Sequence, residues 1–189
     1  MVLPIVNYGH PVLRQKGERL KRVTPEVTKF IADMLATMRD AHGVGLAAQQ
    51  VGKAIQLTVI DVTGIEDRPS SLEIDGQPVV PESIMPLVLI NPEVKPLAEA
   101  IAGSEGCLSF PEIYFDVARP ERVAVTAMNE LGETISFTCG GLLARAVQHE
   151  TDHLNGILFI DYLSKTAKSK LKSELDELVY MTQRELGKR

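Results

Sequence analysis

Apolar residues recur every three or four positions in three segments, a pattern that places them on one face of an α-helix. The first helix is predicted from Thr24-Pro25-Glu26, which suit a helix cap and first turn, to about His42-Gly43. A second begins near Gly141 and ends at Asn155-Gly156, a pair that tolerates the left-handed conformation at a helix end. A third runs from about Lys165 to Glu185. We expect all three to pack on a common core.

Alternating or β-branched stretches predict strands between these helices. They are Gln56–Asp61, Leu87–Asn91, which Asn91-Pro92 is expected to end, and a hairpin of Arg122–Asn129 with Glu133–Thr138. The connection from Thr63 to Pro86 carries four prolines and is predicted as a long loop. We therefore expect an α+β fold, with antiparallel strands packed around a central helix and further helices toward both termini. At 189 residues, the chain 1–189 is expected to form a single catalytic domain.

Composition narrows the function further. With 20 basic and 25 acidic residues the net charge is −5, which argues against broad binding to nucleic-acid backbones. No apolar run approaches the length of a membrane span, so no membrane partner is expected. Two cysteines are too few for a disulfide framework, and residues 1–20 lack the pattern of a secretory signal. We expect a protein of a reducing, cytoplasmic compartment.

The strongest chemical signal is His149-Glu150-Thr151-Asp152-His153 on the second predicted helix. Two histidines one turn apart can bind one metal ion, and the glutamate between them can take a proton from water. Leu142 and Ala146 fall on the same helix face as the two histidines. The alternative is a chance match on a surface helix, but the apolar face running into the histidines favours the metal site.

A metal site of this kind needs a third protein ligand. Cys107 lies beside Gly106 at the end of a predicted strand, where a backbone can approach a ligand closely. Cys139 precedes Gly140-Gly141 and is the more ordinary candidate for a small buried apolar residue. These residues alone favour Cys107 only modestly, and carboxylates remain open as alternatives.

A glycine-rich run, Gly43 to Gly52, is the third feature. Its small residues let backbone lie close to an extended peptide, and the Gln50 amide can donate a hydrogen bond to a developing oxyanion. A dinucleotide site would need this run directly after a strand, whereas here it follows a helix. A plain helix end and turn is the other interpretation.

Together the three segments resemble the peptide deformylase family. Gly43 to Gln50 is similar to its GxGLAAxQ motif, Glu105 to Ser109 to its EGCLS motif, and Gln148 to His153 to its QHExDH motif, all in the right order. The similarity extends from Val12-Leu13-Arg14 to Asp161-Tyr162-Leu163. The long Thr63 to Pro86 connection departs from the compact family pattern.

The resemblance implies a metallohydrolase that removes the formyl group from the N-terminal formylmethionine of newly made bacterial proteins and releases formate. It makes Cys107, His149 and His153 the metal ligands and Glu150 the general base and acid. By the same resemblance, Gln50 and the backbone N–H of Leu108 stabilise the oxyanion. It implies Fe2+ as the working ion, with Ni2+ or Co2+ as active substitutes and Zn2+, which purified protein can also carry, as a poor one.

The same resemblance suggests how substrate is held. Val44, Gly45 and Gly106 would line the bound peptide backbone, and Leu142 and Ala146 are candidate walls of a methionine pocket, although both also suit a plain core role. Glu105 is expected to orient a neighbouring group or to pair with an arginine, Arg145 being the nearest on the helix.

The implied partners are N-formylmethionyl nascent peptides in a bacterial cytoplasm. Four lysines at the start of the last predicted helix suggest a ribosome-docking surface, against the ordinary alternative of a solvated helix face; they are Lys165, Lys168, Lys170 and Lys172.

Two other functions fit parts of the pattern. A zinc endopeptidase shares HExxH, but a third histidine at the usual spacing or a downstream glutamate helix is not recognisable here. A non-catalytic peptide-binding relative would keep the fold, but the intact Gln50, Cys107 and Glu150 argue against it.

Overall fold

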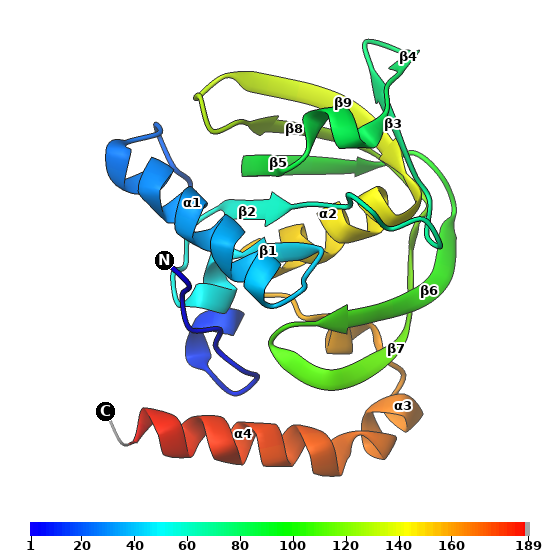
Figure 1. Cartoon of the computed structure of the whole chain (residues 1–189). Coiled ribbons are helices and arrows are strands. Elements are labelled where there is room, and N and C mark those ends of the chain that lie inside the picture. Colours follow the sequence, from blue (N-terminus) through cyan, green and yellow to red (C-terminus); the bar gives the residue numbers. More distant parts are fainter. Residues whose placement is uncertain (188–189) are drawn as a thin grey trace.

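Helix α2 lies between a large antiparallel sheet and a separate two-stranded sheet in the computed structural model, which describes residues 1–187 (Figure 1). The helices are α1 (Pro25–Asp40), α2 (Gly141–Leu154), α3 (Lys165–Lys170) and α4 (Lys172–Leu186). The strands are β1 (Gly45–Ala47), β2 (Leu57–Ile60), β3 (Ser70–Ile74), β4 (Gln77–Pro78), β5 (Leu87–Pro96), β6 (Ala100–Cys107), β7 (Phe110–Pro120), β8 (Arg122–Met128) and β9 (Thr134–Gly140). Short 3-10 helices span Pro11–Arg14, Ala48–Val51, Pro81–Ile84 and Phe159–Tyr162. The predicted α+β fold is confirmed.

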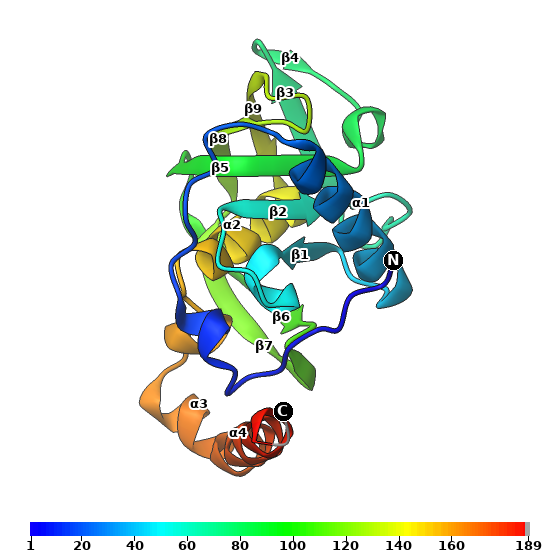
Figure 2. The same cartoon turned by 90° about the vertical axis from the view of Figure 1, so that its left-hand side faces the viewer.

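The large sheet has the strand order β1-β2-β5-β8-β9-β3-β4, and β6 pairs only with β7. Strand β1 is therefore an edge strand, paired with β2 on one side through Leu46 opposite Val59. Its other edge faces α2 and the β6–β7 sheet (Figure 2). Residues of β1, β6 and α2 line one cavity between the two sheets.

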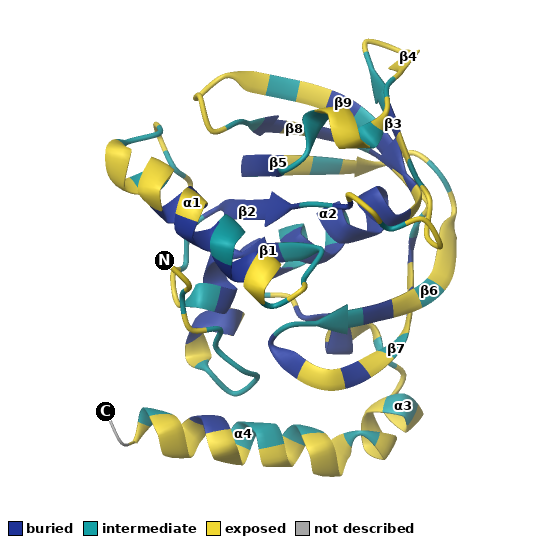
Figure 3. Ribbon diagram, in the orientation of Figure 1, coloured by how far each residue is buried: buried dark blue, intermediate teal, exposed yellow. Residues whose placement is uncertain are grey.

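Alternating side chains of β2 and β5 reach two different apolar clusters. Val59 and Val88 pack with α1, whereas Ile60 and Leu89 pack with α2. Successive strand residues point to opposite faces, so a strand buried on both faces is apolar throughout. The dark blue centre of Figure 3 is this double core, and it fixes α2 against the sheet.

The Thr63 to Pro86 segment is not the loop that the sequence predicts. It contains β3, β4 and the 3-10 helix Pro81–Ile84, and β3 pairs with β9 through Leu72 opposite Cys139. Its prolines lie outside the residues of β3 that pair with β9, so they leave that pairing intact. The prediction was wrong because the strand's partner lies far along the chain.

The predicted end of a strand at Asn91-Pro92 is also wrong. Strand β5 continues to Pro96, with a register shift between Ile90 and Glu93. Asn91 has φ +53°, and its side-chain amide pairs with both the N–H and the C=O of Leu20. The residue that was expected to stop the strand forms a β-bulge in it.

The C-terminal helix is interrupted where the sequence predicts one continuous helix. Leu171 separates α3 from α4. Leu175 and Leu178 pack against an aromatic cluster that contains Phe110 and Phe159. None of the helices in residues 1–187 combines the length and the apolar character that crossing a bilayer requires.

Candidate active site

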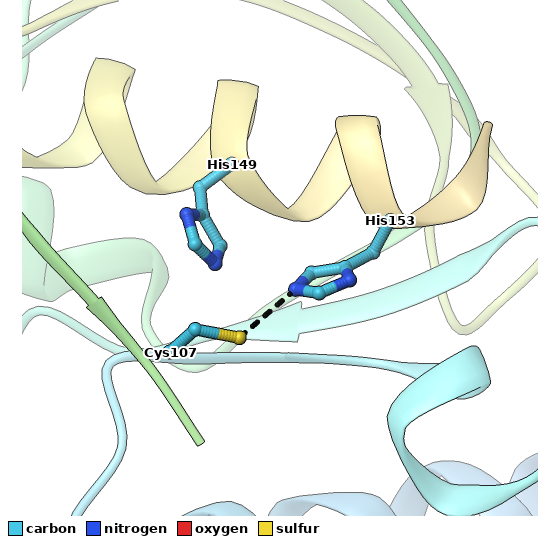
Figure 4. A group of neighbouring side chains, drawn as sticks. All are labelled: Cys107, His149 and His153. Atoms are coloured by element: carbon cyan, nitrogen blue, oxygen red, sulfur yellow. Dashed lines mark hydrogen bonds between the residues drawn. The ribbon is translucent and has the colours of Figure 1, made fainter. Parts of the chain in front are cut away.

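Three side chains from two elements converge beside the edge of β1. His149 and His153 project from one face of α2, and Cys107 ends β6 (Figure 4). Their candidate ligand atoms all lie within 4.8 Å of one another, and Sγ of Cys107 is 3.3 Å from Nε2 of His153. The structure therefore brings together Cys107 rather than Cys139 with the two histidines. Cys139 is buried in the apolar core, where burial raises the pKa of its thiol to about 12.

The turn after β6 sets the position of Cys107. The β6–β7 register shifts between Gly106 and Cys107, so that Cys107 pairs with Phe110 across a tight turn. The ring of Tyr114 covers Gly106 so closely that a Cβ at this position would overlap it. Glycine is therefore needed for this approach of ring to backbone.

Glu105 lies behind the histidines. Its Oε2 is 3.0 Å from Nδ1 of His149, while Arg119 donates to both carboxylate oxygens, at 2.6 and 3.0 Å. Arg145 donates to Oε1 at 2.9 Å. Burial would raise the pKa of Glu105, but hydrogen bonds from His149 and Arg119 outweigh it and lower the pKa to about 2. Glu105 is a carboxylate, so it accepts the Nδ1 proton of His149 and turns Nε2 toward Cys107.

Sequence reasoning identified both possible uses of Glu105 but missed Arg119. Arg119 also donates to Asp152 of α2 at 2.7 Å, and it is buried with only 3% exposure. A buried arginine paired with two carboxylates fixes the β6–β7 sheet to α2. No sequence signal marks Arg119, because it lies in a strand that the apolar pattern does not reveal.

The two histidines differ in their affinity for protons. Burial lowers the pKa of His149, but hydrogen bonds to Cys107 and Glu105 outweigh this and raise the pKa to about 10. Burial holds the pKa of His153 well below its usual value. A metal ion competes with the His149 proton for Nε2, so metal binding releases protons.

Glu150 lies in the same cleft without a hydrogen-bond partner for its Oε2 within residues 1–187. Its carboxylate packs directly against Gly45, where any Cβ would overlap it. The side chain is buried, and burial raises the pKa of Glu150 to about 7. A carboxyl group that titrates near neutral pH suits both the removal and the return of a proton.

Gln50 faces Cys107 from the 3-10 helix Ala48–Val51. Its Oε1 accepts a hydrogen bond from the N–H of Ala47 at 2.8 Å, so its NH2 group must point into the cleft. There Nε2 makes only long contacts, 3.5 Å to Sγ of Cys107 and 3.4 Å to Oγ of Ser109. The N–H of Leu108 has no partner within residues 1–187. Two donors are thus available beside the three candidate ligands.

A cavity of about 380 Å³ contains this chemistry. The metal, catalytic and substrate-binding residues that the family resemblance implies all line it except His153; they are Val44, Gly45, Gln50, Gly106, Cys107, Leu108, Leu142, Ala146, His149 and Glu150. Glu105 and Arg145 line it too. Sequence reasoning missed Arg68, which comes from the Thr63 to Pro86 segment and donates to the carbonyl of Ser104 at 2.9 Å. It also missed Tyr114, which lies on the unpredicted strand β7.

The donor set fits a divalent transition metal. One thiolate and two imidazoles are the ligands that Zn2+ and Fe2+ share with Ni2+ and Co2+, and three protein ligands are typical of catalytic sites. The lone pair of His149 Nε2 is available once its proton leaves, because Glu105 holds the Nδ1 proton. Within residues 1–187 this is the group of side chains found suitable for holding a metal.

Comparison with known proteins gives one consistent result. The family model described as polypeptide deformylase matches residues 2–169. A peptide deformylase of Opitutus terrae is 42% identical over 184 residues, covering 96% of this chain and 95% of the relative. One from Methylacidiphilum infernorum is 46% identical over 178 residues, covering 94% of this chain and 93% of the relative.

Solved structures agree with the sequence comparisons. A peptide deformylase from Synechococcus elongatus, in complex with actinonin, matches with a TM-score of 0.75 and 38% identity. It covers 96% of this chain and 86% of that one. A peptide deformylase from Legionella pneumophila matches with a TM-score of 0.79 and 33% identity, covering 97% of this chain and 99% of that one.

Proposed function

This chain belongs to the polypeptide deformylase family, and from that membership we propose how its own residues divide the work of the reaction. The protein is a metal-dependent hydrolase that removes the formyl group from the N-terminal methionine of newly made proteins. The whole chain serves as one catalytic domain. The observation that carries this proposal is the meeting of Cys107, His149 and His153 with the unpartnered Glu150 carboxylate in one cleft.

Cys107, His149 and His153 hold the metal, and Fe2+ is the working ion. When bound, the ion supplies Lewis-acid polarisation of the formyl group and of water. Glu105 supports this role by keeping His149 in the tautomer with a free Nε2. Ni2+ and Co2+ can replace Fe2+, and Zn2+ gives a poorly active form.

Glu150 moves the protons. Its carboxylate takes a proton from the attacking water and later gives it to the nitrogen of the leaving amine. The raised pKa of Glu150, about 7, supports this double role because the proton is neither too firmly nor too weakly held. Oε2 is buried without a partner within residues 1–187, and Glu150 lines the cavity, so a water bound there would satisfy the carboxylate.

Gln50 and Leu108 stabilise the negative charge on the formyl oxygen. The Nε2 of Gln50 exchanges its long contacts for a hydrogen bond to the tetrahedral oxyanion, and the N–H of Leu108 gives a second. The Ala47 N–H holds the Gln50 amide in place before substrate arrives. Donors oriented in advance cost little reorganisation during the reaction.

The substrate peptide lies along β1 as an added strand. Val44 and Gly45 at this free edge and Gly106 on β6 border the cavity from opposite sides. Leu142 and Ala146 of α2 form the wall for the methionine side chain. An apolar pocket gains about 0.8 kcal/mol for each methylene-sized group it buries, so formyl-methionyl peptides are preferred over formyl-glycyl ones.

The enzyme meets its substrate in the bacterial cytoplasm, near the ribosome. Four exposed lysines on α3 and at the start of α4 form the docking surface; they are Lys165, Lys168, Lys170 and Lys172. Replacing Lys165, Lys168 and Lys170 with Glu should abolish co-sedimentation with ribosomes. Replacing Glu174 and Glu177 with Gln is the control. Unchanged co-sedimentation after charge reversal would remove this surface from the proposal.

The decisive test of function compares two products. A formyl-methionyl peptide of several residues is incubated with metal-loaded protein. Released formate and fragments cut at internal peptide bonds are both measured. We expect formate and an intact deformylated peptide. Internal cleavage without formate would instead indicate an endopeptidase, and binding without either product would indicate a non-catalytic relative.

A further inference from the structure

The N-terminal segment Val6–Gly9 runs between α4 and the active-site cleft. Figures 1 and 2 both show the blue N-terminal segment beside α4. The N–H of Val6 donates to the carbonyl of Gln50 at 2.9 Å, and the N–H of Tyr8 donates to the carbonyl of Ser109 at 2.9 Å. One short segment therefore joins the 3-10 helix Ala48–Val51 to the turn between β6 and β7, through residues that lie 59 positions apart in the chain.

These two carbonyls belong to the backbone that carries the proposed oxyanion donors. One is the carbonyl of Gln50 itself, and the other follows Leu108 by one residue. The Gln50 side chain and Ser109 are both buried, with 1% and 0% exposure. Val6 and Tyr8 hold the backbone of these two residues through their carbonyls, and the side chains of Gln50 and Ser109 add a long contact of 3.4 Å.

The other side of the segment is held by α4. A Cβ at Gly9 would lie 2.9 Å from Cα of Val179 and 3.4 Å from Cβ of Thr182. Gly9 has φ +102°, which side-chain-bearing residues rarely adopt. Thr182 is buried against this contact, although most of α4 is exposed. The Tyr8 ring also stacks on the ring of Phe110, the residue that follows Ser109, with ring centres 4.8 Å apart.

We propose that Val6–Gly9 is a positioning strap for deformylation: its two backbone donors fix the spacing between Gln50 and Leu108, and α4 fixes the strap through Gly9. The proposal rests on the oxyanion roles given to Gln50 and Leu108 above. None of the strap residues is among those that line the cavity. They act through the 3-10 helix Ala48–Val51 and the β6–β7 turn, so their effect falls on the catalytic constant kcat more than on KM.

Hydrogen exchange in the unaltered protein gives the first test. The amides of Val6 and Tyr8 should exchange slowly, whereas that of Ile5, which has no partner within residues 1–187, should exchange quickly. Equal exchange at Val6, Tyr8 and Ile5 would overturn the proposal. This measurement does not depend on the folding of any variant.

A proline scan gives the second test. Val6→Pro removes the N–H that reaches Gln50, and Ile5→Pro introduces the same ring one residue earlier, where no hydrogen bond is lost. We expect kcat to fall about tenfold in Val6→Pro, less than the loss of a whole oxyanion donor, with KM and metal content unchanged. Ile5→Pro should keep the wild-type kcat. Equal kcat values in the two variants, or an effect confined to KM, would refute the strap.

A double substitution separates this role from general support of the fold. In a Gln50→Ala background, Val6→Pro should lower kcat by much less than in the wild type, because the group that it positions is gone. A full tenfold loss in that background would show that the segment acts elsewhere and would overturn the proposal.

Gly9→Ala tests the contact with α4. The added Cβ meets Val179, whereas Gly76→Ala places a Cβ at a similar positive φ, +72°, with nothing within 4 Å. Gly9→Ala should lower kcat severalfold and speed exchange at Tyr8, and Gly76→Ala should do neither. Slower catalysis in both variants, or in neither, would remove α4 from the proposal. If the wild-type protein releases no formate, the proposed function fails, whereas the exchange pattern still reports on the strap.

Discussion

Nδ1 of His149 lies 3.0 Å from Oε2 of Glu105, and this contact links the proposed metal ligands to a buried cluster of charges. The same carboxylate accepts hydrogen bonds from Arg119 and Arg145. Glu105 thus both orients an imidazole and neutralises arginines that have almost no access to water. Metal affinity and the stability of the β6–β7 sheet depend on one side chain.

Replacing Glu105 with Gln tests both roles, through metal affinity and through the stability of the metal-free protein. Metal affinity should fall roughly 10- to 100-fold, because the orienting acceptor of His149 is weakened. The metal-free protein should also lose about 3 kcal/mol or more of stability, since Arg145 loses its one carboxylate partner within residues 1–187 and Arg119 keeps only Asp152. Chelator competition and urea unfolding measure these effects. Glu112→Gln, on the same cavity wall, should change neither. Unchanged affinity in Glu105→Gln would contradict the orienting role.

Glu150→Gln should keep the fold and the metal but lose nearly all deformylation. The amide has similar volume but cannot accept the proton of water, and general acid–base catalysis typically contributes 10²- to 10⁴-fold. Formate release and metal content are measured on the same preparation. Normal metal content together with normal activity would show that Glu150 is not the base.

The metal-free protein should reveal the buried Glu150 through its pH dependence. Because the pKa of Glu150 is raised from 4.5 to about 7 by burial, the folded state binds the proton more tightly than the unfolded state. Stability therefore falls as the pH rises from about 4.5 to about 7, by about 3 kcal/mol in total. Glu150→Gln lacks this loss, and His149 titrates in both proteins. The free energy of unfolding of the variant should therefore rise relative to that of the wild type across this pH interval. Below the interval the difference between the two proteins should stay constant. A constant difference between the two unfolding curves would rule out the raised pKa.

Gln50→Ala should affect the transition state rather than binding. Loss of one oxyanion donor typically costs about 3 kcal/mol, a hundred- to thousandfold in kcat, with KM nearly unchanged. Gln49→Ala is the matched control, since Gln49 is equally buried but its amide has a single hydrogen-bond partner within residues 1–187, the carbonyl of Gln15 at 3.5 Å. A change in KM alone for Gln50→Ala would contradict the assigned role.

Local sequence patterns predict the parts of this fold that depend on local contacts. The helices at Pro25–Asp40 and Gly141–Leu154 follow from apolar spacing and end residues, and the hairpin of β8 and β9 follows from two alternating runs. The histidines share a face because one helix carries both. In contrast, β3 exists through its pairing with β9 across almost seventy residues, which no local pattern reveals.

The same limit applies to the site. Spacing within α2 predicts two metal ligands, but within the sequence only the family resemblance settles the choice between Cys107 and Cys139. The choice depends on the turn between β6 and β7. Strand β7 was not predicted because its hydropathy does not follow its burial: Tyr114 and Ala118 are exposed, whereas the charged Arg119 is buried. Arg119 and Tyr114 both lie on that strand, so both were missed for one reason. Arg68 was missed because it lies in a segment predicted as a loop.

The identity of the metal should decide the activity that is measured. A site of one thiolate and two imidazoles binds Zn2+ well, and such sites usually bind Zn2+ more tightly than Fe2+. Protein purified in air can therefore be expected to carry zinc. One metal-free preparation should be loaded with Fe2+, Ni2+ or Zn2+ without oxygen and assayed for formate release. We expect the iron and nickel forms to be fast and the zinc form slow. A zinc form as fast as the iron form would contradict the assignment of iron.

Air should then distinguish iron from nickel through Cys107. A thiolate beside a redox-active ion can be oxidised to sulfenic and sulfinic acid, after which it binds metal poorly. The iron form should therefore lose activity in air while the nickel form keeps it, and mass spectrometry should find the added oxygen on Cys107. Cys139 is the internal control, because it is buried in the apolar core and burial raises the pKa of its thiol.

Cys107→Asp should lower activity sharply, since a hard carboxylate changes ligand charge and geometry, whereas Cys139→Ala should keep its metal. Metal retained by Cys107→Ala and lost by Cys139→Ala would reverse the choice of ligand.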